Sequence, residues 1–304
     1  MEGLLAPHHL NEEAARAHIE ATRWPDGPVC PHCGSVNEAY KLTPNPASKH
    51  PVRPGVWKCK VCAKQFTATV DSIFSDSHIP LHKWLLAIHL LCSSKKGFSA
   101  HQLYRNLDFG SYRTAWFMLH RIRWAMTQAP MNAMLGGEGK VVEGDETYVG
   151  GREKGKRGMP GPDSKKTPVV ALVERGGDVR SFPVERVTVE NIKPIIKEHI
   201  DPNTHFVTDE NVVYYFTRDV VPDHHTVNHS KKKHVRREGD LKVTTNTVES
   251  FFAILKRGNY GVYHHWSRKY MGQYCAEFDF RYNVRDMDDT ERAVVALKCA
   301  GPSA

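Results

Sequence analysis

The sequence lacks the features that mark a secreted or membrane-spanning protein. Its most apolar segment, residues 84–92, has about half the length needed to cross a bilayer. The first residues carry no basic stretch that leads into an apolar run, so no signal peptide is predicted. Internal repeats and low-complexity segments are also absent. We therefore expect a cytoplasmic protein with no membrane partner.

Cysteine is scarce, and the histidines form no recognisable zinc motif. The 304 residues include 7 cysteines, which a reducing cytosol keeps as thiols. Three of them, Cys92, Cys275 and Cys299, stand alone and are interpreted as plain core or surface thiols. No HxxxH or HExxH pair on a predicted helix indicates a second zinc site among the 18 histidines.

Positive charge is in excess and unevenly distributed. The net charge is +8 and the pI about 9.0, which suits a polyanionic partner such as nucleic acid. Basic residues concentrate in segments 152–166 and 231–237, both of which are predicted to be loops. Hydrophobic residues at 40% and charged residues at 25% are ordinary for a globular protein.

The N-terminal half is predicted to be a zinc ribbon followed by helices. Asn11 is a suitable N-cap for a helix over residues 11–22, and a Trp-Pro-Asp-Gly-Pro sequence ends that helix. Helices over residues 99–107 and 111–126, around a turn at 108–110, fit a helix-turn-helix, with an ordinary helical hairpin as the alternative. We expect an N-terminal helix (1–23), a zinc ribbon (24–75), a helical DNA-binding region (76–128) and a linker (129–139).

Two CxxC pairs predict the zinc site of that ribbon. Two thiolates separated by two residues span one edge of a tetrahedron, so two such pairs complete the ligand set of a structural Zn²⁺. Gly34 follows the first pair, where a positive φ is tolerated. His32 and His50 are alternative ligands. The predicted ligands are Cys30, Cys33, Cys59 and Cys62.

After the linker the pattern changes to that of an α/β domain over residues 140–285, followed by a C-terminal tail (286–304). Strands are predicted at 140–149, 167–174, 179–184 and 205–209, with helices at 188–199, 247–257 and 267–283. Three strands, a helix, a strand and then helices is the order of a ribonuclease-H-like domain, a mixed sheet with flanking helices.

Three carboxylates in this domain are candidates for binding divalent metal ions. Asp145 lies within a predicted strand, and Asp209 ends an apolar strand; both are costly positions for a carboxylate without a partner. Glu249 lies at the start of an apolar helix, and its neighbours suggest that it points inward. Phosphodiester cleavage by two metals needs carboxylates that converge from separate elements in this way.

Other acidic residues compete for the same role. Glu143 shares the strand face of Asp145 and is the nearest competitor. Glu146 and Glu210 adjoin the two aspartates, and strand alternation predicts that their side chains point away. Spacing alone also leaves open three unrelated carboxylates.

Four segments of the sequence form a recognisable set. They are Val142-Glu-Gly-Asp-Glu-Thr-Tyr-Val-Gly-Gly151, Val227-Asn-His-Ser230, Asn246-Thr-Val-Glu-Ser-Phe-Phe-Ala-Ile-Leu-Lys-Arg-Gly258 and Glu277-Phe-Asp-Phe-Arg-Tyr-Asn283. Together they resemble the transposases of insertion-sequence family 1595. The resemblance covers most of the chain, including Arg23-Trp-Pro-Asp-Gly27 and the cysteine pairs.

This resemblance implies a DDE-type transposase. It carries the family's acidic residues onto Asp145, Asp209 and Glu249, and the family's trailing lysine onto Lys256. Some members have Asn at the third acidic position, and Glu there favours a complete metal site. Glu210 departs from the family pattern, in which a small residue is expected.

Two histidines, His225 and His229, have a structural interpretation as well as a functional one. In such proteins His225 and His229 lie near the active-site segment. They could contact DNA or order the loop, but a structural histidine is the favoured interpretation for each of them.

The implied reaction nicks DNA at transposon ends and joins the freed 3′-hydroxyls to target DNA, using two Mg²⁺ or Mn²⁺ ions. The partners would be double-stranded DNA, recognised at terminal inverted repeats by the ribbon and helices, and further copies of this chain on that DNA at the nucleoid. Lys256 and both basic segments would bind phosphates. The expected DNA-binding residues are Arg152, Lys154, Lys156, Arg157, Lys231, Lys232, Lys233, Arg236 and Arg257.

Two rival functions remain at this point. One is a non-enzymatic zinc-ribbon DNA-binding regulator, in which the α/β part is a scaffold. The other is a structure-specific nuclease without strand transfer.

Overall fold

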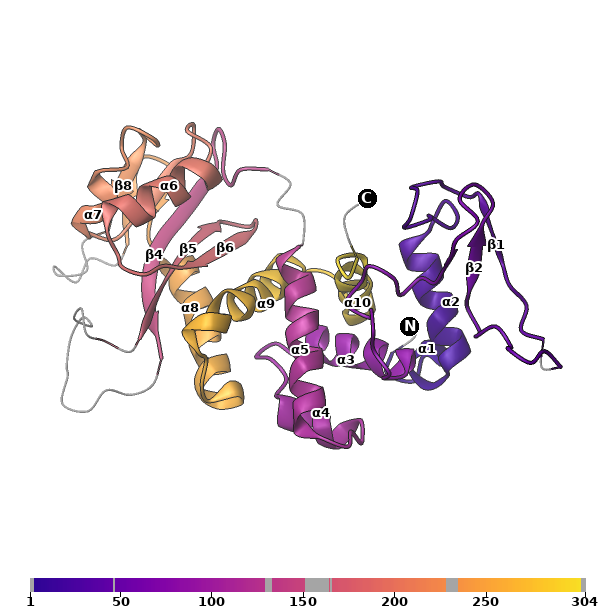
Figure 1. The fold of residues 1–304 in the computed structure, drawn as a ribbon. Coiled ribbons are helices and arrows are strands. Elements are labelled where there is room, and N and C mark those ends of the chain that lie inside the picture. Colours follow the sequence, from indigo (N-terminus) through magenta and orange to yellow (C-terminus); the bar gives the residue numbers. More distant parts are fainter. Residues whose placement is uncertain are drawn as a thin grey trace. The chain divides into compact units, whose positions relative to one another are not determined.

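The chain folds into two compact units (Figure 1). The computed structural model describes residues 3–45, 47–128, 133–150, 164, 166–227 and 235–301. The first unit contains residues 1–129 and 287–304, and the second contains residues 130–286. No helix in the described ranges is long and apolar enough to cross a membrane.

The first unit begins with two helices and a small antiparallel sheet. Helix α1 (Pro7–Leu10) leads into α2 (Glu12–Arg23), whose first amides at Glu13 and Ala14 donate to the Asn11 side chain as predicted. The sheet has the order β1-β2-β3. Its strands are β1 (Ala39–Lys41), β2 (Trp57–Cys59) and β3 (Gln65–Phe66).

Four further helices belong to the described part of this unit. Ser99 and Ser111 cap α4 and α5, in agreement with the two helices predicted around a turn. Helix α10 packs against α3 and begins with a capping box between Asp288 and Glu291. The expected C-terminal tail therefore contains a helix of the first unit. The bounds are α3 (Leu81–Ser93), α4 (Ala100–Asn106), α5 (Tyr112–Thr127) and α10 (Asp289–Lys298).

A five-stranded mixed sheet organises the second unit, in the order β6-β5-β4-β7-β8. The pairs β4–β5 and β5–β6 are antiparallel, whereas the pairs β4–β7 and β7–β8 are parallel. The sequence predicted four of these strands and missed β8. The bounds are β4 (Val141–Val149), β5 (Thr167–Glu174), β6 (Val179–Pro183), β7 (His205–Thr208) and β8 (His224–Thr226).

Helices cover both faces of the sheet. On one face Ala171 packs with α8 and α9, and on the other Leu172 packs with α6. Alternate residues of β5 therefore enter different cores, which explains its uninterrupted apolar sequence. The bounds are α6 (Val189–His199), α7 (Val212–Tyr215), α8 (Asn246–Gly258) and α9 (Met271–Asn283), with a π-helix at Asn259–Tyr263 and a 3₁₀ turn at Arg268–Tyr270.

Helix α9 also closes the free edge of the sheet at β6. The Asn283 side chain accepts from the Val179 amide at 2.8 Å and donates to its carbonyl at 3.1 Å. One helical turn earlier, Asp279 accepts from the Ser181 amide at 2.8 Å and from its hydroxyl at 2.6 Å. Side chains thus replace the strand partner that an edge lacks.

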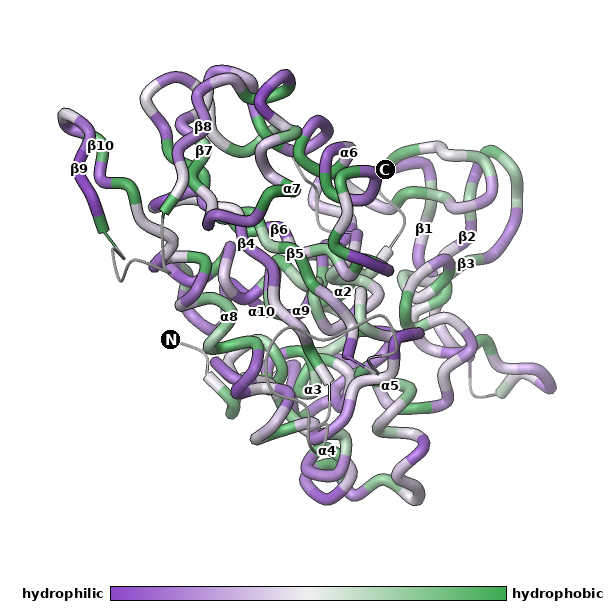
Figure 2. The backbone as a smooth tube through the Cα atoms, turned by 90° about the vertical axis from the view of Figure 1, so that its left-hand side faces the viewer, coloured by the Kyte–Doolittle hydropathy of each residue, from purple (hydrophilic) through white to green (hydrophobic). Residues whose placement is uncertain are grey.

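Two segments differ from the sequence expectations. Residues 133–139, expected as part of a linker, belong to the second unit, because Leu135 is buried there and exchanges backbone hydrogen bonds with His199 and Asp201. A two-stranded hairpin, β9 (Arg236–Glu238) and β10 (Leu241–Val243), was not predicted. Figure 2 shows β9 as mostly hydrophilic.

Candidate active site and zinc site

The two CxxC pairs bring four sulfur atoms together in the first unit. The Sγ atoms of Cys30 and Cys62 lie 3.7 Å apart, and so do those of Cys33 and Cys59. Four sulfurs bound about 2.3 Å from one zinc ion lie about 3.8 Å from one another. The predicted cysteines therefore fit a structural Zn²⁺ without rearrangement.

Local backbone geometry explains why this site forms. Gly34 and Ala63, the residues that follow each cysteine pair, both have positive φ, at 73° and 58°. Ser35 Oγ lies 3.3 Å from Cys59 Sγ, and this hydrogen bond lowers the pKa of Cys59 to about 6, which favours the thiolate that zinc requires. His32, an alternative ligand, instead has Nε2 3.2 Å from the Gln65 carbonyl.

In the second unit, Asp145 and Asp209 meet at the boundary between β4 and β7. These strands are parallel, and Glu143 lies opposite Val207. Asp145 and Asp209 each lie two residues further along their segments, so they reach the same level of the sheet. Carboxylate oxygens of Asp145, Asp209 and Glu146 lie within 4.8 Å of one another. The predicted approach of two aspartates from separate strands is therefore found.

Glu146 belongs to this cluster, contrary to the prediction that its side chain points away. Strand β7 ends before Asp209, whereas β4 continues, so the edge of β4 is open at Glu146. Its carboxylate accepts from Asn211 Nδ2 at 2.7 Å and from Tyr214 Oη at 2.8 Å. Strand alternation did not predict the position of Glu146, because the open edge of β4 lets this long side chain reach around the strand.

Burial and mutual repulsion raise pKa values within the carboxylate cluster. Burial, followed by the charges of Glu146 and Asp209, raises the pKa of Asp145 to about 8, and Glu249 adds to the effect. Burial also raises the pKa of Glu146. Several carboxylates that repel one another in a partly buried site are held in their charged form when a cation binds between them.

Glu249 lies near the cluster but is not among the three carboxylates within 4.8 Å of one another. It is exposed on α8, whose buried face carries Val248 and Phe252, so the expectation that it points inward is wrong. The Thr245 hydroxyl donates to Glu249 Oε1 at 2.8 Å. Its electrostatic effect on Asp145 nevertheless places it at the border of the same site.

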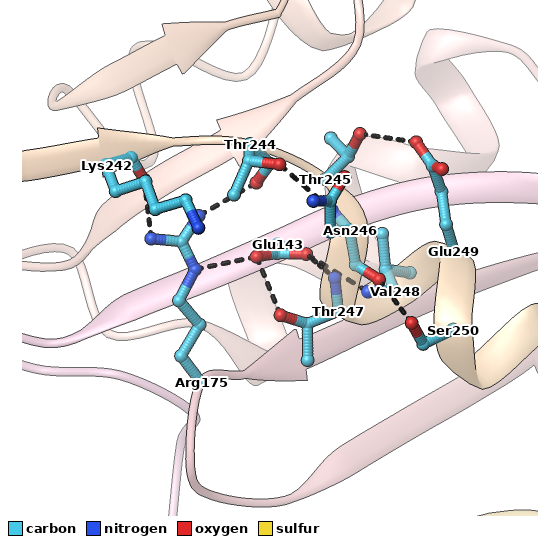
Figure 3. Close-up of polar contacts among 10 residues, drawn as sticks. All are labelled: Glu143, Arg175, Lys242, Thr244, Thr245, Asn246, Thr247, Val248, Glu249 and Ser250. Carbon is cyan, nitrogen blue, oxygen red and sulfur yellow. Dashed lines mark hydrogen bonds and ion pairs between the residues drawn. The ribbon is translucent and has the colours of Figure 1, made fainter. Parts of the chain in front are cut away.

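Glu143, the strongest competitor by sequence, has another role: it caps α8 (Figure 3). Its fully buried carboxylate accepts from the amides of Thr247 at 2.7 Å and Val248 at 3.0 Å. The Thr247 hydroxyl donates at 2.9 Å, and Arg175 Nε at 2.6 Å. Because α8 has no side-chain cap of its own, Glu143 supplies one from β4.

Most of the expected DNA-binding residues lie outside the described residues. These are Arg152, Lys154, Lys156, Arg157, Lys231, Lys232 and Lys233. Of the remainder, Arg236 is exposed on β9 and pairs with Glu238 at 2.6 Å, and Arg257 is exposed on α8. Lys256 is half-buried on the same helix, two turns after Glu249.

Comparison with known proteins identifies the family. Residues 134–283 match the ISXO2-like transposase domain, and residues 10–65 match the transposase zinc-ribbon domain. The chain belongs to the insertion-sequence 1595 family of transposases. The carboxylate cluster lies within the matched transposase domain, and all four cysteines lie within the matched ribbon.

This transposase also resembles a protein from Halobacterium salinarum described as "Uncharacterized protein in transposable element ISH50". The two are 26% identical over 275 residues, which cover 82% of this chain and 83% of that protein.

Proposed function

We propose that this transposase nicks DNA at transposon ends and joins the 3′-hydroxyls to target DNA through a two-metal site in a ribonuclease-H-like domain. The observation that carries the proposal is the approach of Asp145 on β4 to Asp209, which directly follows the parallel neighbouring strand β7. The strand order β6-β5-β4-β7-β8, with three antiparallel strands followed by two parallel ones, supports the ribonuclease-H-like assignment.

The donor set suits Mg²⁺ or Mn²⁺. The ligands offered are carboxylate oxygens, which hard divalent cations prefer. When bound, two such ions activate the attacking oxygen and stabilise the charge on the phosphorus centre and the leaving oxygen. In this assignment Asp145 and Asp209 bind the ions from the sheet, and Glu249 binds from the exposed side of α8, where DNA can approach.

Glu146 has a supporting position in this proposal. Its carboxylate is held by Asn211 and Tyr214, so it is less able to reorient around a metal ion than Asp145. Its charge raises the pKa of Asp145 and so changes the affinity of Asp145 and Asp209 for cations. We assign Asp145, Asp209 and Glu249 as ligands and Lys256 as a phosphate contact.

The first unit is proposed to recognise the transposon ends. The ribbon (24–75) and the helical region (76–128) supply two DNA-binding modules, in which α4 and α5 form the helix-turn-helix. The basic segments of the catalytic domain (140–285) supply affinity that is independent of DNA sequence. Action at two transposon ends calls for a homo-oligomer on the DNA, at the nucleoid.

Matched substitutions test the assignment. Asp145→Asn, Asp209→Asn and Glu249→Gln each remove an anionic ligand while keeping the side-chain shape. We expect each to abolish Mg²⁺-dependent nicking and strand transfer on transposon-end DNA. DNA binding should persist, because repulsion of phosphates decreases. Glu210→Gln is the control that keeps activity, and Glu146→Gln should retain measurable nicking.

The same assays separate the rival functions. A wild-type protein that binds end DNA but never cleaves it with Mg²⁺ or Mn²⁺ is a DNA-binding regulator. Cleavage with no joining of pre-nicked ends to target DNA indicates a nuclease. Full activity in Glu249→Gln, with loss in Glu146→Gln, would transfer the third ligand position to Glu146.

A further inference from the structure

We propose that His205, Asp223 and His225 form a second transition-metal site, separate from both the cysteine site and the carboxylate cluster. The site would bind a borderline divalent ion such as Zn²⁺ through two imidazole nitrogens and one carboxylate. Donor atoms of the three residues lie within 4.8 Å of one another.

The sheet brings these residues to one place. His205 begins β7, Asp223 precedes β8, and the Phe206 amide donates to the Asp223 carbonyl at 2.9 Å, so the two ligands are on adjacent strands. His225 lies two residues after Asp223, and alternation puts both side chains on the same face. Asp209, at the other end of β7, belongs to the carboxylate cluster, so the two sites lie at opposite ends of this strand.

The carboxylate of Asp223 already joins the two histidines. Its Oδ2 contacts His205 Nδ1, and its Oδ1 lies 2.8 Å from His225 Nε2. The Nε2 contact lacks hydrogen-bond geometry, and this buried nitrogen has no hydrogen-bond partner among the described residues. The nitrogen therefore faces a carboxylate oxygen in an arrangement that a cation between the two would satisfy.

Glu238 prepares His225 to bind that cation. Glu238 Oε2 lies 2.6 Å from His225 Nδ1, and a proton on Nδ1 leaves the Nε2 lone pair directed at Asp223. A carboxylate that fixes the outer nitrogen of a metal-binding histidine is a recurrent feature of protein metal sites. The β9–β10 hairpin carries Glu238, and Val243 of this hairpin packs against Val207 on the same face of the sheet.

The donor chemistry suits a zinc-like ion. Ligand atoms about 2.0–2.2 Å from a tetrahedral Zn²⁺ lie roughly 3.4 Å apart, so binding would widen both direct contacts of Asp223, the 2.8 Å contact to His225 and the shorter one to His205, by a rotation of the half-exposed Asp223 carboxylate. Two imidazoles with one carboxylate favour Zn²⁺, Co²⁺ or Ni²⁺ over Mg²⁺. A fourth position remains for water.

Metal stoichiometry tests the site without any activity measurement. The full chain is equilibrated with Zn²⁺ in the presence of excess Mg²⁺, so that Mg²⁺ occupies the carboxylate cluster. The protein is then dialysed, and its metal content is measured. We expect two zinc ions per chain in the wild type and one in His205→Gln, Asp223→Asn and His225→Gln. His265→Gln, which replaces another exposed histidine of the same unit, should retain two.

Two further variants complete the experiment. Glu238→Gln should keep the stoichiometry at saturating Zn²⁺ but weaken binding by about 10- to 100-fold, because it only orients His225. Asp145→Asn should retain both zinc ions, which separates this proposal from the catalytic one. Circular dichroism checks that each variant is folded, and His205→Gln, at the start of its strand, is the least disruptive. One zinc per chain in the wild type, or two in folded His205→Gln, would overturn the site and leave only direct histidine–carboxylate contacts.

Discussion

Arg175 Nε lies 2.6 Å from Glu143 Oε1, and the same Glu143 carboxylate accepts from the amides of Thr247 and Val248 at the start of α8. The same guanidinium donates to the carbonyls of Lys242 at 2.6 Å and Thr244 at 2.8 Å. The pair therefore determines how the chain leaves β10 and enters the helix that carries Glu249 (Figure 3). A residue that resembles a metal ligand by sequence thus positions the element on which a proposed ligand lies.

Replacing Glu143 should destabilise the second unit and loosen α8. Glu143→Gln removes the negative charge that accepts four hydrogen bonds and leaves Arg175 without its counter-charge. We expect the free energy of unfolding to fall by about 3 kcal/mol in urea titrations. Hydrogen exchange should accelerate at the Thr247 and Val248 amides.

The exposed Glu249 provides the matched control for that experiment. Glu249→Gln should change the free energy of unfolding by about 0.5 kcal/mol or less. Equal stability of the Glu143 and Glu249 variants would show that the cap on α8 contributes nothing.

The carboxylate cluster should link stability, pH and metal binding. Asp145 has a pKa of about 8 in the folded protein, against 3.8 normally, so between these values the folded state retains a proton that the unfolded state has lost. Without divalent cations, this contribution to stability is complete below pH 4 and is lost as the pH rises to about 8. Mg²⁺ competes with that proton, so its affinity should rise by about tenfold per pH unit below pH 8 and level off above.

Calorimetry in buffers of different ionisation enthalpy measures this linkage. Binding of Mg²⁺ at pH 7 should release protons from the wild type but not from Asp145→Asn. Asp279 is the control, because burial also raises its pKa to about 8 while its carboxylate is bound to Ser181 on β6. Asp279→Asn should therefore preserve Mg²⁺-linked proton release, and loss of the release in that variant would contradict the assignment to Asp145.

Removing one cysteine should eliminate the structural zinc and leave the second unit folded. Cys59→Ser removes a ligand whose sulfur contacts Ser35 and Cys33. The two CxxC pairs then no longer share a four-cysteine metal site. We expect one zinc fewer per chain by metal analysis and weaker binding to transposon-end DNA. His32→Gln should keep the metal, and a zinc-free wild type would refute the site.

Neutralising one basic segment should change the salt dependence of DNA binding. Replacing Lys154, Lys156 and Arg157 with Gln should reduce the log-log salt slope by roughly one unit for each lost phosphate contact. Binding titrations over a range of salt concentrations measure this slope.

A triple replacement near α6 serves as the comparison for net charge. Arg186, Lys193 and Lys197 carry the same total charge, and Lys193 is already paired with Asp219 at 2.6 Å. If both triple variants change the slope equally, net charge alone is responsible rather than contacts from the basic segment.

Features that depend on neighbours in the chain could be read from the sequence. The cysteine pairs, the Asn11 cap and the strand predicted over residues 140–149 agree with the structure, because paired cysteines, helix caps and strands are formed by residues a few positions apart. Asp145 and Asp209 were found for a related reason, since a carboxylate within or directly after an apolar strand needs a partner.

Only the tertiary structure decided where Glu146, Glu143 and the histidines lie. Glu146 reaches the cluster because β7 ends one residue before Asp209, and strand ends are set by packing rather than by local pattern. Glu143 caps a helix more than a hundred residues later in the chain. His205 and His225 meet because β7 and β8 pair in a parallel register, which a linear motif search cannot detect. Contacts of this kind depend on the closure of long loops, and no local periodicity encodes them.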